Sequence, residues 1–420
     1  MDVGAASIDI TPDYPIRLSG YGSRKTESEG IAQRLHASAM AIGNDAQGPA
    51  LLVSVDNCGL PLTLREEVGR RLGKHSIRDE RINLCSTHTH CAPCLTGVLP
   101  NLFSSPIIAS EQKTIDRYTA ELTDKIEQVC LQALQHRQPS QLRFGQGSVD
   151  FAQNRRTKGG PVDHTLNLLV AFGTNNTAQA LFANYACHCT TLGGEFNKVH
   201  GDWAGVAREA IEQETPNTIA IISLGCGGDA NPQPRGTVEL VNQHGHEFAA
   251  EVKQILSHLT PIGASFTSAA KALDLPFDPL PTRQQWEERA KKSGIVAYHA
   301  RLNLERIDRG ETLPKSIPYP IQTLSFGTNL TMVFLPGEVV IDYDLELKKV
   351  FDPKRVCVIG YANYVPCYIP SRRILEEGGY EAEDSLWYYD RPARLSPSIE
   401  QTIVNTAQTL PPAGFKISDR

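Results

Sequence analysis

Short apolar runs rich in β-branched residues recur along the chain and are separated by stretches in which apolar residues repeat every three or four positions. The short runs predict strands at residues 3–10, 51–55, 82–85, 166–172, 180–185, 218–224, 331–335 and 355–359. The longer stretches predict helices at residues 62–72, 110–138, 203–213, 238–256, 283–307 and 341–350. This mixture predicts an α/β fold of layered sheets flanked by helices.

The length of the chain and the positions of its proline- and glycine-bearing stretches favour a single large domain over residues 1–420. With 420 residues and 40% hydrophobic content, the chain can bury a sizeable core. We find no internal repeat and no low-complexity segment. Proline- and glycine-bearing stretches at residues 276–281 and 310–320 flank a charged helical pattern, which predicts a helical excursion at residues 276–320.

Charge and hydropathy exclude two classes of partner. The formal net charge is −6, so no basic face is expected to hold a nucleic acid. No apolar run approaches the roughly 20 residues that span a bilayer, and we expect no transmembrane segment. The first residues lack a charged leader and an apolar signal region, so a cytoplasmic location is expected, although a trimmed signal peptide would leave no trace.

Ten cysteines lie mostly in apolar runs, which is typical of reduced, buried thiols in so long a chain. Two pairs, Cys91-x-x-Cys94 and Cys187-x-Cys189, also have a spacing compatible with a structural zinc site. Each pair lies beside a histidine that has a candidate role of its own. We therefore keep the zinc interpretation of the cysteines as an alternative to buried thiols.

The segment after the strand at residues 82–85 contains His88 and His90, embedded among serine and threonine. If the strand continues, side chains at i and i+2 point to the same side and both imidazoles face one cavity. Imidazole is the most common zinc ligand, and an imidazole that does not bind metal can transfer protons near neutral pH. The alternative is a polar strand end with two solvated histidines.

Three further junctions carry residues suited to chemistry. His188 follows the strand at 180–185, and Asp202 is predicted to cap the helix at 203–213. A glycine-rich turn at 225–228 precedes Asp229 and could aim backbone N–H groups at an anion, although a tight turn explains it equally well. Glu338 and the tyrosines near residues 361–380 follow the last apolar runs of the chain. Taken alone, Glu338 is explained by a favourable position at the start of a helix, and the tyrosines are explained by ordinary packing.

Taken in chain order, these segments resemble the catalytic domain of the neutral/alkaline ceramidase family. The matching segments run from about residue 3 to residue 390, and their shared order is more specific than any one of them. They are the opening Ala6-Ser-Ile-Asp-Ile-Thr-Pro12, Gly20-Tyr-Gly22, His88-Thr-His90, Asn154-Arg155, the His188 loop, the Gly228-Asp229 turn, Pro336-Gly-Glu338 and the paired tyrosines.

The resemblance implies an αββα-like sandwich and a zinc ion held by His88, His188, Glu338 and Tyr368. The family has a second tyrosine twelve residues after the ligand tyrosine, and Tyr368 and Tyr380 have this separation, which favours Tyr368 over Tyr364.

Such a zinc ion would bring the pKa of a bound water toward roughly 7 and so provide hydroxide to attack an amide carbonyl. We expect Arg155 and Tyr380 to stabilise the resulting oxyanion together with the metal, and His90 to pass the proton to the leaving amine.

Two departures from the family bear on the substrate and the mechanism. The family's serine in the Gly-Asp turn is replaced by Asn231, which excludes a serine nucleophile there and leaves a side chain that could hydrogen-bond substrate. The chain also ends soon after the catalytic region, so no C-terminal immunoglobulin-like domain is expected. Aromatic residues make up only 7% of the chain, and a small polar N-acyl substrate is therefore expected at least as much as a lipid amide.

Two other functions remain open from the sequence alone. A scaffold that binds metal or ligand without turnover would account for Asn231, although His90, Arg155 and Tyr380 argue against it. A zinc enzyme acting on esters, lactones or phosphate esters would use the same ligands, because the metal alone does not select the bond.

Overall fold

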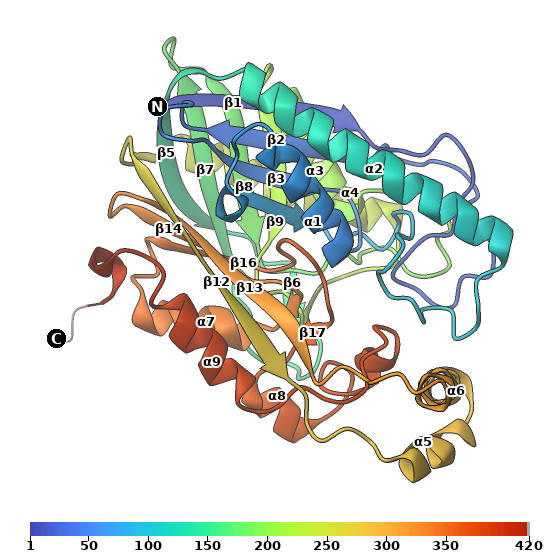
Figure 1. Ribbon diagram of the computed structural model, residues 1–420. Coiled ribbons are helices and arrows are strands. Elements are labelled where there is room, and N and C mark those ends of the chain that lie inside the picture. Colours follow the sequence, from blue (N-terminus) through green and yellow to red (C-terminus); the bar gives the residue numbers. More distant parts are fainter. Residues whose placement is uncertain (418–420) are drawn as a thin grey trace.

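The computed structural model describes residues 1–417, which form two sheets packed face to face between layers of helices (Figure 1). The larger sheet has the strand order β4-β3-β2-β1-β5-β7-β8-β9, and β11 pairs with β5. Its strands are β1 (Asp2–Asp9), β2 (His36–Ile42), β3 (Ala50–Val55), β4 (Ile82–Ser86), β5 (Gln138–Ser148), β7 (Thr165–Gly173), β8 (Ala178–Tyr185), β9 (Ile219–Leu224) and β11 (Thr260–Pro261).

The smaller sheet has the order β12-β13-β14-β16, and two short strand pairs lie beside it. Its strands are β12 (Phe266–Pro276), β13 (Ser316–Phe326), β14 (Leu330–Phe334) and β16 (Val356–Ile359). The short pairs are β6 (Ala152–Asn154) with β10 (Ala230–Pro232), and β15 (Glu338–Val339) with β17 (Tyr368–Ile369). These short pairs carry several of the predicted site residues.

Period-two alternation divides the strands of the larger sheet between two hydrophobic cores. In β3, Leu51 and Val53 face the helices, whereas Leu52 faces the smaller sheet. The same alternation places Phe182 of β8 against the smaller sheet, which supplies Phe334 from β14 to this interface. Because successive side chains of a strand point to opposite faces, each strand connects the two cores.

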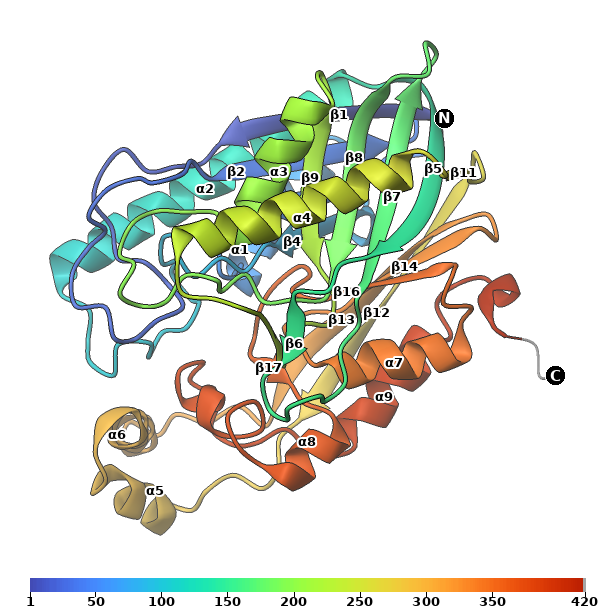
Figure 2. The same ribbon diagram turned by 180° about the vertical axis from the view of Figure 1, so that it is seen from behind.

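Helices cover the outer faces of both sheets (Figures 1 and 2). The larger sheet is covered by α1 (Leu62–Gly73), α2 (Ala109–Gln135), α3 (Asp202–Glu214) and α4 (Val238–Leu256). The smaller sheet is covered by α7 (Ile341–Val350) and α9 (Ile399–Ala407), with the short α8 (Arg372–Glu377) nearby. Three single-turn 3₁₀ helices lie at Asp79–Arg81, Asp384–Trp387 and Ala413–Phe415. The predicted α/β class, with layered sheets flanked by helices, is confirmed.

Between β12 and β13 the chain leaves the sheet and forms α5 (Arg283–Ala290) and α6 (Gly294–Asp308). Both helices protrude from the end of the smaller sheet (Figures 1 and 2). The sequence pattern predicts one helix over 283–307, and this is wrong. The helix is interrupted at residues 291–293, and Gly294 has a left-handed backbone with φ +63°, which a continuous helix does not allow.

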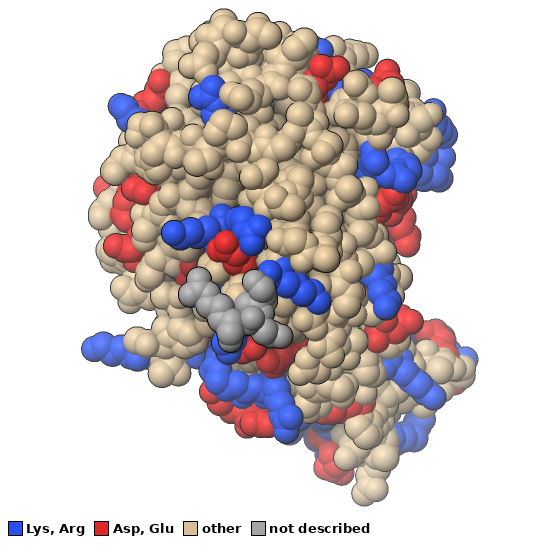
Figure 3. Space-filling view, turned by 90° about the vertical axis from the view of Figure 1, so that its left-hand side faces the viewer, with Lys and Arg blue, Asp and Glu red and all other residues tan. Residues whose placement is uncertain are grey.

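Within residues 1–417, no helix combines the length and apolar character needed to cross a bilayer. On the face shown in Figure 3, acidic and basic side chains are interspersed rather than gathered by sign. That face therefore offers no broad basic surface for a polyanion.

Candidate metal centre

The first histidine of the site lies immediately after β4 in a strained loop. His88 has a left-handed backbone with φ +55°, a conformation that costs a residue other than glycine about 1–3 kcal/mol. The strand therefore does not continue through His88 and His90 as the i, i+2 argument assumed. Both rings nevertheless reach the same place, because their Nε2 atoms lie 3.0 Å apart.

Two side chains from distant parts of the sequence, His188 and Glu338, converge with His88 at the centre. The Nε2 atom of His88 lies 3.1 Å from Oε2 of Glu338, and the Nε2 atom of His188 lies 3.0 Å from the same oxygen. His188 follows β8, and Glu338 begins β15, whose parallel pairing with β17 sets Glu338 opposite Tyr368. All three side chains of His88, His188 and Glu338 are buried.

Backbone carbonyls fix the orientation of both imidazoles. The Nδ1 atom of His88 bonds the carbonyl of Cys58, and Nδ1 of His188 lies 2.6 Å from the carbonyl of Gly227. A carbonyl can only accept, so each Nδ1 carries a proton, and each Nε2 presents a lone pair when it is not itself protonated. The Nε2 atoms are therefore the ring nitrogens that face the carboxylate oxygen of Glu338.

These groups fit a metal ion on chemical grounds. Two imidazole lone pairs and a carboxylate oxygen are all acceptors, and at hydrogen-bond distance they need a cation between them. His88, His188 and Glu338 form a group of ligand atoms that all lie within 4.8 Å of one another. A second such group is Cys58, His88 and His90. Two histidines and one carboxylate are a ligand set typical of zinc.

The pKa values of His88, His188 and Glu338 are shifted because these side chains are buried close together. Burial disfavours charge on His88, but the neighbouring Glu338 raises the pKa of His88 to about 10. Burial and the charge of Arg155 together lower the pKa of His188 to about 4. Burial would raise the pKa of Glu338, yet the two imidazoles hold it well below its ordinary value. In the protein alone, a proton on His88 therefore supplies the positive charge between these acceptors.

Tyr368 reaches the centre with its phenol oxygen. That oxygen lies 3.2 Å from Nε2 of His188 and accepts a hydrogen bond of 3.0 Å from Arg155. Arg155 is held in turn by Glu381, to whose carboxylate its Nε donates at 2.7 Å. Burial raises the pKa of Tyr368 well above its ordinary value although Arg155 opposes the shift, so the phenol is neutral. Its oxygen still has a lone pair to offer a metal.

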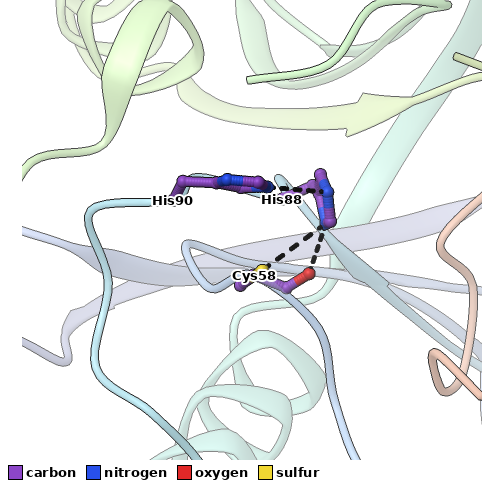
Figure 4. Close-up of side chains that lie close together, drawn as sticks. All are labelled: Cys58, His88 and His90. Atoms are coloured by element: carbon purple, nitrogen blue, oxygen red, sulfur yellow. Dashed lines mark hydrogen bonds between the residues drawn. The ribbon is translucent and has the colours of Figure 1, made fainter. Parts of the chain in front are cut away.

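His90 and Cys58 both contact His88, His90 at Nε2 and Cys58 at Nδ1 (Figure 4). The would-be Cβ of Gly20 falls 2.2 Å from the His90 ring, so only glycine allows the chain to pass there. Burial, together with His88 and His188, lowers the pKa of His90 well below its ordinary value. His90 is therefore neutral at pH 7 in the protein alone.

A cavity of about 250 Å³ opens directly beside these groups. Its walls are formed by Gly20, Tyr21, Gly22, Ser23, Cys58, His88, His90, Leu99, Leu102, Ser104, Glu338, Tyr368, Tyr380, Tyr388 and Tyr389. The structure thus brings five of the eight predicted site residues to the wall of one cavity, whereas His188 contacts Glu338 from outside that wall.

Three of the predicted residues, Tyr380, Arg155 and Asn231, differ in how they lie relative to the cavity. Tyr380 lines the cavity, is 45% exposed, and has its ring 5.5 Å from that of Tyr368. Arg155 lies behind Tyr368 and is not among the residues lining the cavity. Asn231 is not in the cavity wall either; it follows Ala230, whose carbonyl accepts the N–H of His188.

A model of the family described as "neutral/alkaline non-lysosomal ceramidase, N-terminal" matches residues 1–254. The chain belongs to this family. Two curated relatives, the neutral ceramidases of Drosophila melanogaster and Drosophila pseudoobscura pseudoobscura, are each 26% identical over 238 residues. These matches cover 52% of this chain and only 33% of each relative, so the aligned part is a third of the relative's length.

Two solved structures share the fold of this ceramidase-family chain. The neutral ceramidase from Pseudomonas aeruginosa superposes with a TM-score of 0.76 at 18% identity, covering all of this chain and 76% of that one. A ceramidase complexed with C2 superposes with a TM-score of 0.76 at 15% identity, covering 97% of this chain and 74% of that one. The family predicted from the ordered motifs is confirmed.

Asp202 has a different role in this ceramidase-family chain from the predicted helix cap. It is the first residue of α3, and the cap position is taken by Gly201, which makes no side-chain cap bond. The carboxylate of Asp202 accepts the N–H groups of Thr191 at 3.0 Å and Leu192 at 2.9 Å, as well as that of Trp203. Asp202 therefore anchors the His188 loop to the start of α3.

The alternative zinc site at the cysteine pairs finds no support in the described part of the chain. All ten cysteines are free and buried. Neither candidate metal group among residues 1–417 contains Cys91, Cys94, Cys187 or Cys189. These thiols pack as small apolar side chains.

Several residues of the site were missed by the sequence reasoning. Tyr389 donates its hydroxyl proton to Oε1 of Glu338, and Glu381 holds Arg155. Asp229 accepts the N–H of Ile341 at 2.9 Å and the side-chain amide of Asn154 at 3.0 Å, so it ties together two site-bearing segments. The Gly-Asp turn was the available signal for Asp229; for Tyr389 and Glu381 the local sequence has none.

The bond from Tyr389 to Glu338 leads to a prediction for metal affinity. A partner that orients a ligand carboxylate typically contributes about 10- to 100-fold to metal affinity. We expect Tyr389→Phe to weaken zinc binding by about this factor, measured by competition with a chromogenic chelator. Tyr388→Phe is the matched control, because the Tyr388 hydroxyl makes no contact with Glu338; equal affinities of the two variants would contradict the assignment.

Proposed function

We propose that this chain is a zinc-dependent hydrolase that cleaves the amide bond of an N-acyl compound. The observation that carries the proposal is the convergence of two imidazole Nε2 atoms and one carboxylate oxygen, from His88, His188 and Glu338, beside a cavity whose wall includes His88 and Glu338. Membership of a family whose curated relatives are named neutral ceramidases supports an amide as the bond that is cleaved.

The proposed zinc ligands are His88, His188 and Glu338, with the phenol oxygen of Tyr368 as the fourth. When bound, the ion would supply a Lewis acid that polarises a carbonyl oxygen and makes water a stronger acid. Arg155 orients the fourth ligand by donating to the Tyr368 oxygen, and Glu381 fixes Arg155 from behind. The ligand oxygen and the guanidinium are thereby placed before substrate arrives.

Tyr380 and Arg155 are the proposed stabilisers of negative charge on the substrate oxygen. Tyr380 stands in the cavity wall, where its hydroxyl can donate directly. Arg155 lies one side chain further back and acts through Tyr368 and through its own charge. Asn231 lies outside the cavity wall, where its backbone pairs with Gln153 of β6, the strand that leads to Arg155, and we assign it no contact with substrate.

His90 is proposed to carry the proton from the attacking water to the leaving amine. Its imidazole lines the cavity, and its Nε2 lies 3.0 Å from the ligand atom of His88. A group at this position can accept a proton beside the reacting carbonyl and donate it across the cavity. No serine nucleophile is required by this arrangement, which agrees with the asparagine at position 231.

Metal analysis followed by a substrate screen tests the proposal. We expect one zinc per chain and turnover of at least one N-acyl compound. Full zinc occupancy without turnover of any amide would instead favour a protein that binds metal or ligand without catalysis. Turnover confined to esters, lactones or phosphate esters would retain the metal centre and refute the choice of bond.

Zinc binding is also expected to stabilise the fold measurably. A ligand present at about 1,000 times its Kd adds about 4.1 kcal/mol to the stability of the folded state. Unfolding entropy of about 2.1 cal/mol/K per residue gives about 0.9 kcal/mol/K for 420 residues, so Tm should rise by about 5 °C. The measurement is differential scanning fluorimetry of chelator-stripped protein with added zinc, and Glu338→Gln, which loses a ligand charge, should shift much less. An equal rise in both proteins would mean that zinc binds elsewhere.

A further inference from the structure

Four hydroxyl groups in the wall of the metal-centre cavity have no hydrogen-bond partner within the described protein: those of Ser23, Ser104, Tyr380 and Tyr388. The other tyrosine hydroxyls of the wall are engaged. Tyr21 donates to the carbonyl of Leu192 at 2.8 Å, and the hydroxyls of Tyr368 and Tyr389 contact Arg155 and Glu338. The cavity therefore presents a set of free donors and acceptors around the metal centre.

The cavity is too small to enclose a long acyl chain. Its volume of about 250 Å³ is below the roughly 300–1,000 Å³ of pockets that enclose drug-sized ligands. Leu99 and Leu102 are the only aliphatic side chains in its wall. A hydrocarbon tail in this cavity would displace water from the serine and tyrosine hydroxyls of the wall and leave them unpaired.

The protein surface around the cavity entrance does not provide the apolar contacts that the cavity itself lacks. Among residues 1–417 the large exposed hydrophobic side chains are Ile31, Ile108, Tyr380 and Ile417, and only Tyr380 belongs to the cavity wall. An enzyme that draws a lipid from a bilayer needs a contiguous apolar surface at its entrance. The wall of this cavity provides one half-exposed tyrosine.

The charged side chains of the cavity wall also limit the charge that a ligand can carry. Apart from the imidazoles, Glu338 is the one acidic or basic side chain in the wall, and no lysine or arginine lines the cavity. A substrate carboxylate or phosphate would find no cationic side chain in the wall to pair with. The wall therefore suits a neutral compound.

From these observations we propose that the site takes a small, neutral, hydroxyl-bearing N-acyl compound with a short acyl group, about the size of an N-acetylated monosaccharide. This inference rests on the proposed amide hydrolysis and specifies its substrate class. The free hydroxyls of Ser23, Ser104 and Tyr388 recognise the hydroxyl groups of the amine portion, Tyr380 keeps its proposed role at the carbonyl oxygen, and the tight cavity limits the acyl portion. Water is released as the compound binds, and each wall hydroxyl gains a partner on the ligand.

Three amides distinguish this substrate class from the others. The zinc-loaded protein is assayed with N-acetylglucosamine, with N-acetylcyclohexylamine, which has a ring of the same size but no hydroxyls, and with N-hexadecanoylsphingosine in mixed micelles. We expect kcat/KM for N-acetylglucosamine to exceed the other two by at least about 100-fold, because a site with polar groups rejects analogues that leave them unpaired. Preference for the long-chain amide, or equal cleavage of the two ring compounds, would overturn the inference.

If the proposed amide hydrolysis is wrong, binding measurements can still test the inferred substrate class. If no amide is cleaved, calorimetry with N-acetylglucosamine and N-acetylcyclohexylamine still tests recognition: selective binding of the hydroxylated compound supports the substrate class while refuting hydrolysis. Binding of neither compound would refute the substrate class as well.

Variants of the wall test the role of the free hydroxyls. Ser104→Ala and Tyr388→Phe are each expected to lower kcat/KM for N-acetylglucosamine by about three- to tenfold, the range of one neutral hydrogen bond, and to leave that for N-acetylcyclohexylamine unchanged. Ser105→Ala is the matched control, because the Ser105 hydroxyl is exposed and bonds the Phe103 carbonyl. Equal losses with both compounds would show that the hydroxyls do not recognise substrate.

Discussion

Replacement of His188 by alanine is expected to abolish stoichiometric zinc binding and to lower amide hydrolysis by on the order of 1,000-fold or more. A metal contributes several kcal/mol of transition-state stabilisation, and each 1.36 kcal/mol corresponds to a factor of ten. His188 approaches both Glu338 and Tyr368, so its loss removes the contact that joins them. Zinc content by mass spectrometry and kcat/KM on the same preparation measure the effect.

The control for this prediction is His164→Ala. His164 is a partly exposed histidine whose Nδ1 lies 3.0 Å from the carbonyl of Val149, and it takes no part in the metal group. This variant should keep one zinc per chain and its full activity. A His188→Ala protein that also kept both would remove the basis of the proposed metal centre.

Replacement of His90 by alanine is expected to separate metal binding from turnover. General acid–base catalysis by a positioned side chain contributes about 100- to 10,000-fold, so kcat should fall by this range. Zinc content should stay at one per chain, because His90 is not one of the proposed ligands. Steady-state kinetics and zinc analysis of the variant are the two measurements.

Chemical rescue strengthens the test of His90. The ring of His90 packs against Gly20, and its removal leaves a space beside the cavity that free imidazole can enter. Added imidazole should restore part of the lost kcat if His90 transfers a proton. Turnover that survives the substitution intact, with zinc retained, would show that the assignment is wrong.

Much of the fold could be predicted because hydrophobic periodicity follows burial. The helices predicted at 62–72, 238–256 and 341–350 match α1, α4 and α7 within one residue at each end, since each has one apolar face toward a sheet. The strands at 82–85 and 180–185 also lie where their apolar runs predict them. Buried strands and amphipathic helices carry their own signal.

The strands that were missed lack that signal for identifiable reasons. β2 contains three alanines, which are weak strand formers, and β5 is largely polar with two glycines. β13 contains Pro318 and Pro320, which discourage a strand assignment. The structure accommodates both prolines because that part of β13 pairs only with β12; pairing with β14 begins at Gln322.

The site could be predicted residue by residue only through ordered motifs. His88, His188, Glu338 and Tyr368 lie in segments up to 280 residues apart, and periodicity cannot say that they meet. The groups that orient them, the carbonyls of Cys58 and Gly227, belong to the backbone and have no side-chain signature. The packing of loops at the ends of the two sheets decides these contacts.

The left-handed backbone of His88 costs conformational stability at the position where the proposed function needs an imidazole. Glycine adopts φ +55° without the steric penalty, so a search for thermal stability alone would favour glycine there. Under the proposed function, an imidazole at this position provides a nitrogen ligand at this local cost. Engineers who raise the heat resistance of this protein by consensus or computational scoring should therefore hold residue 88 fixed, because the substitution that most relaxes the loop also removes a proposed zinc ligand.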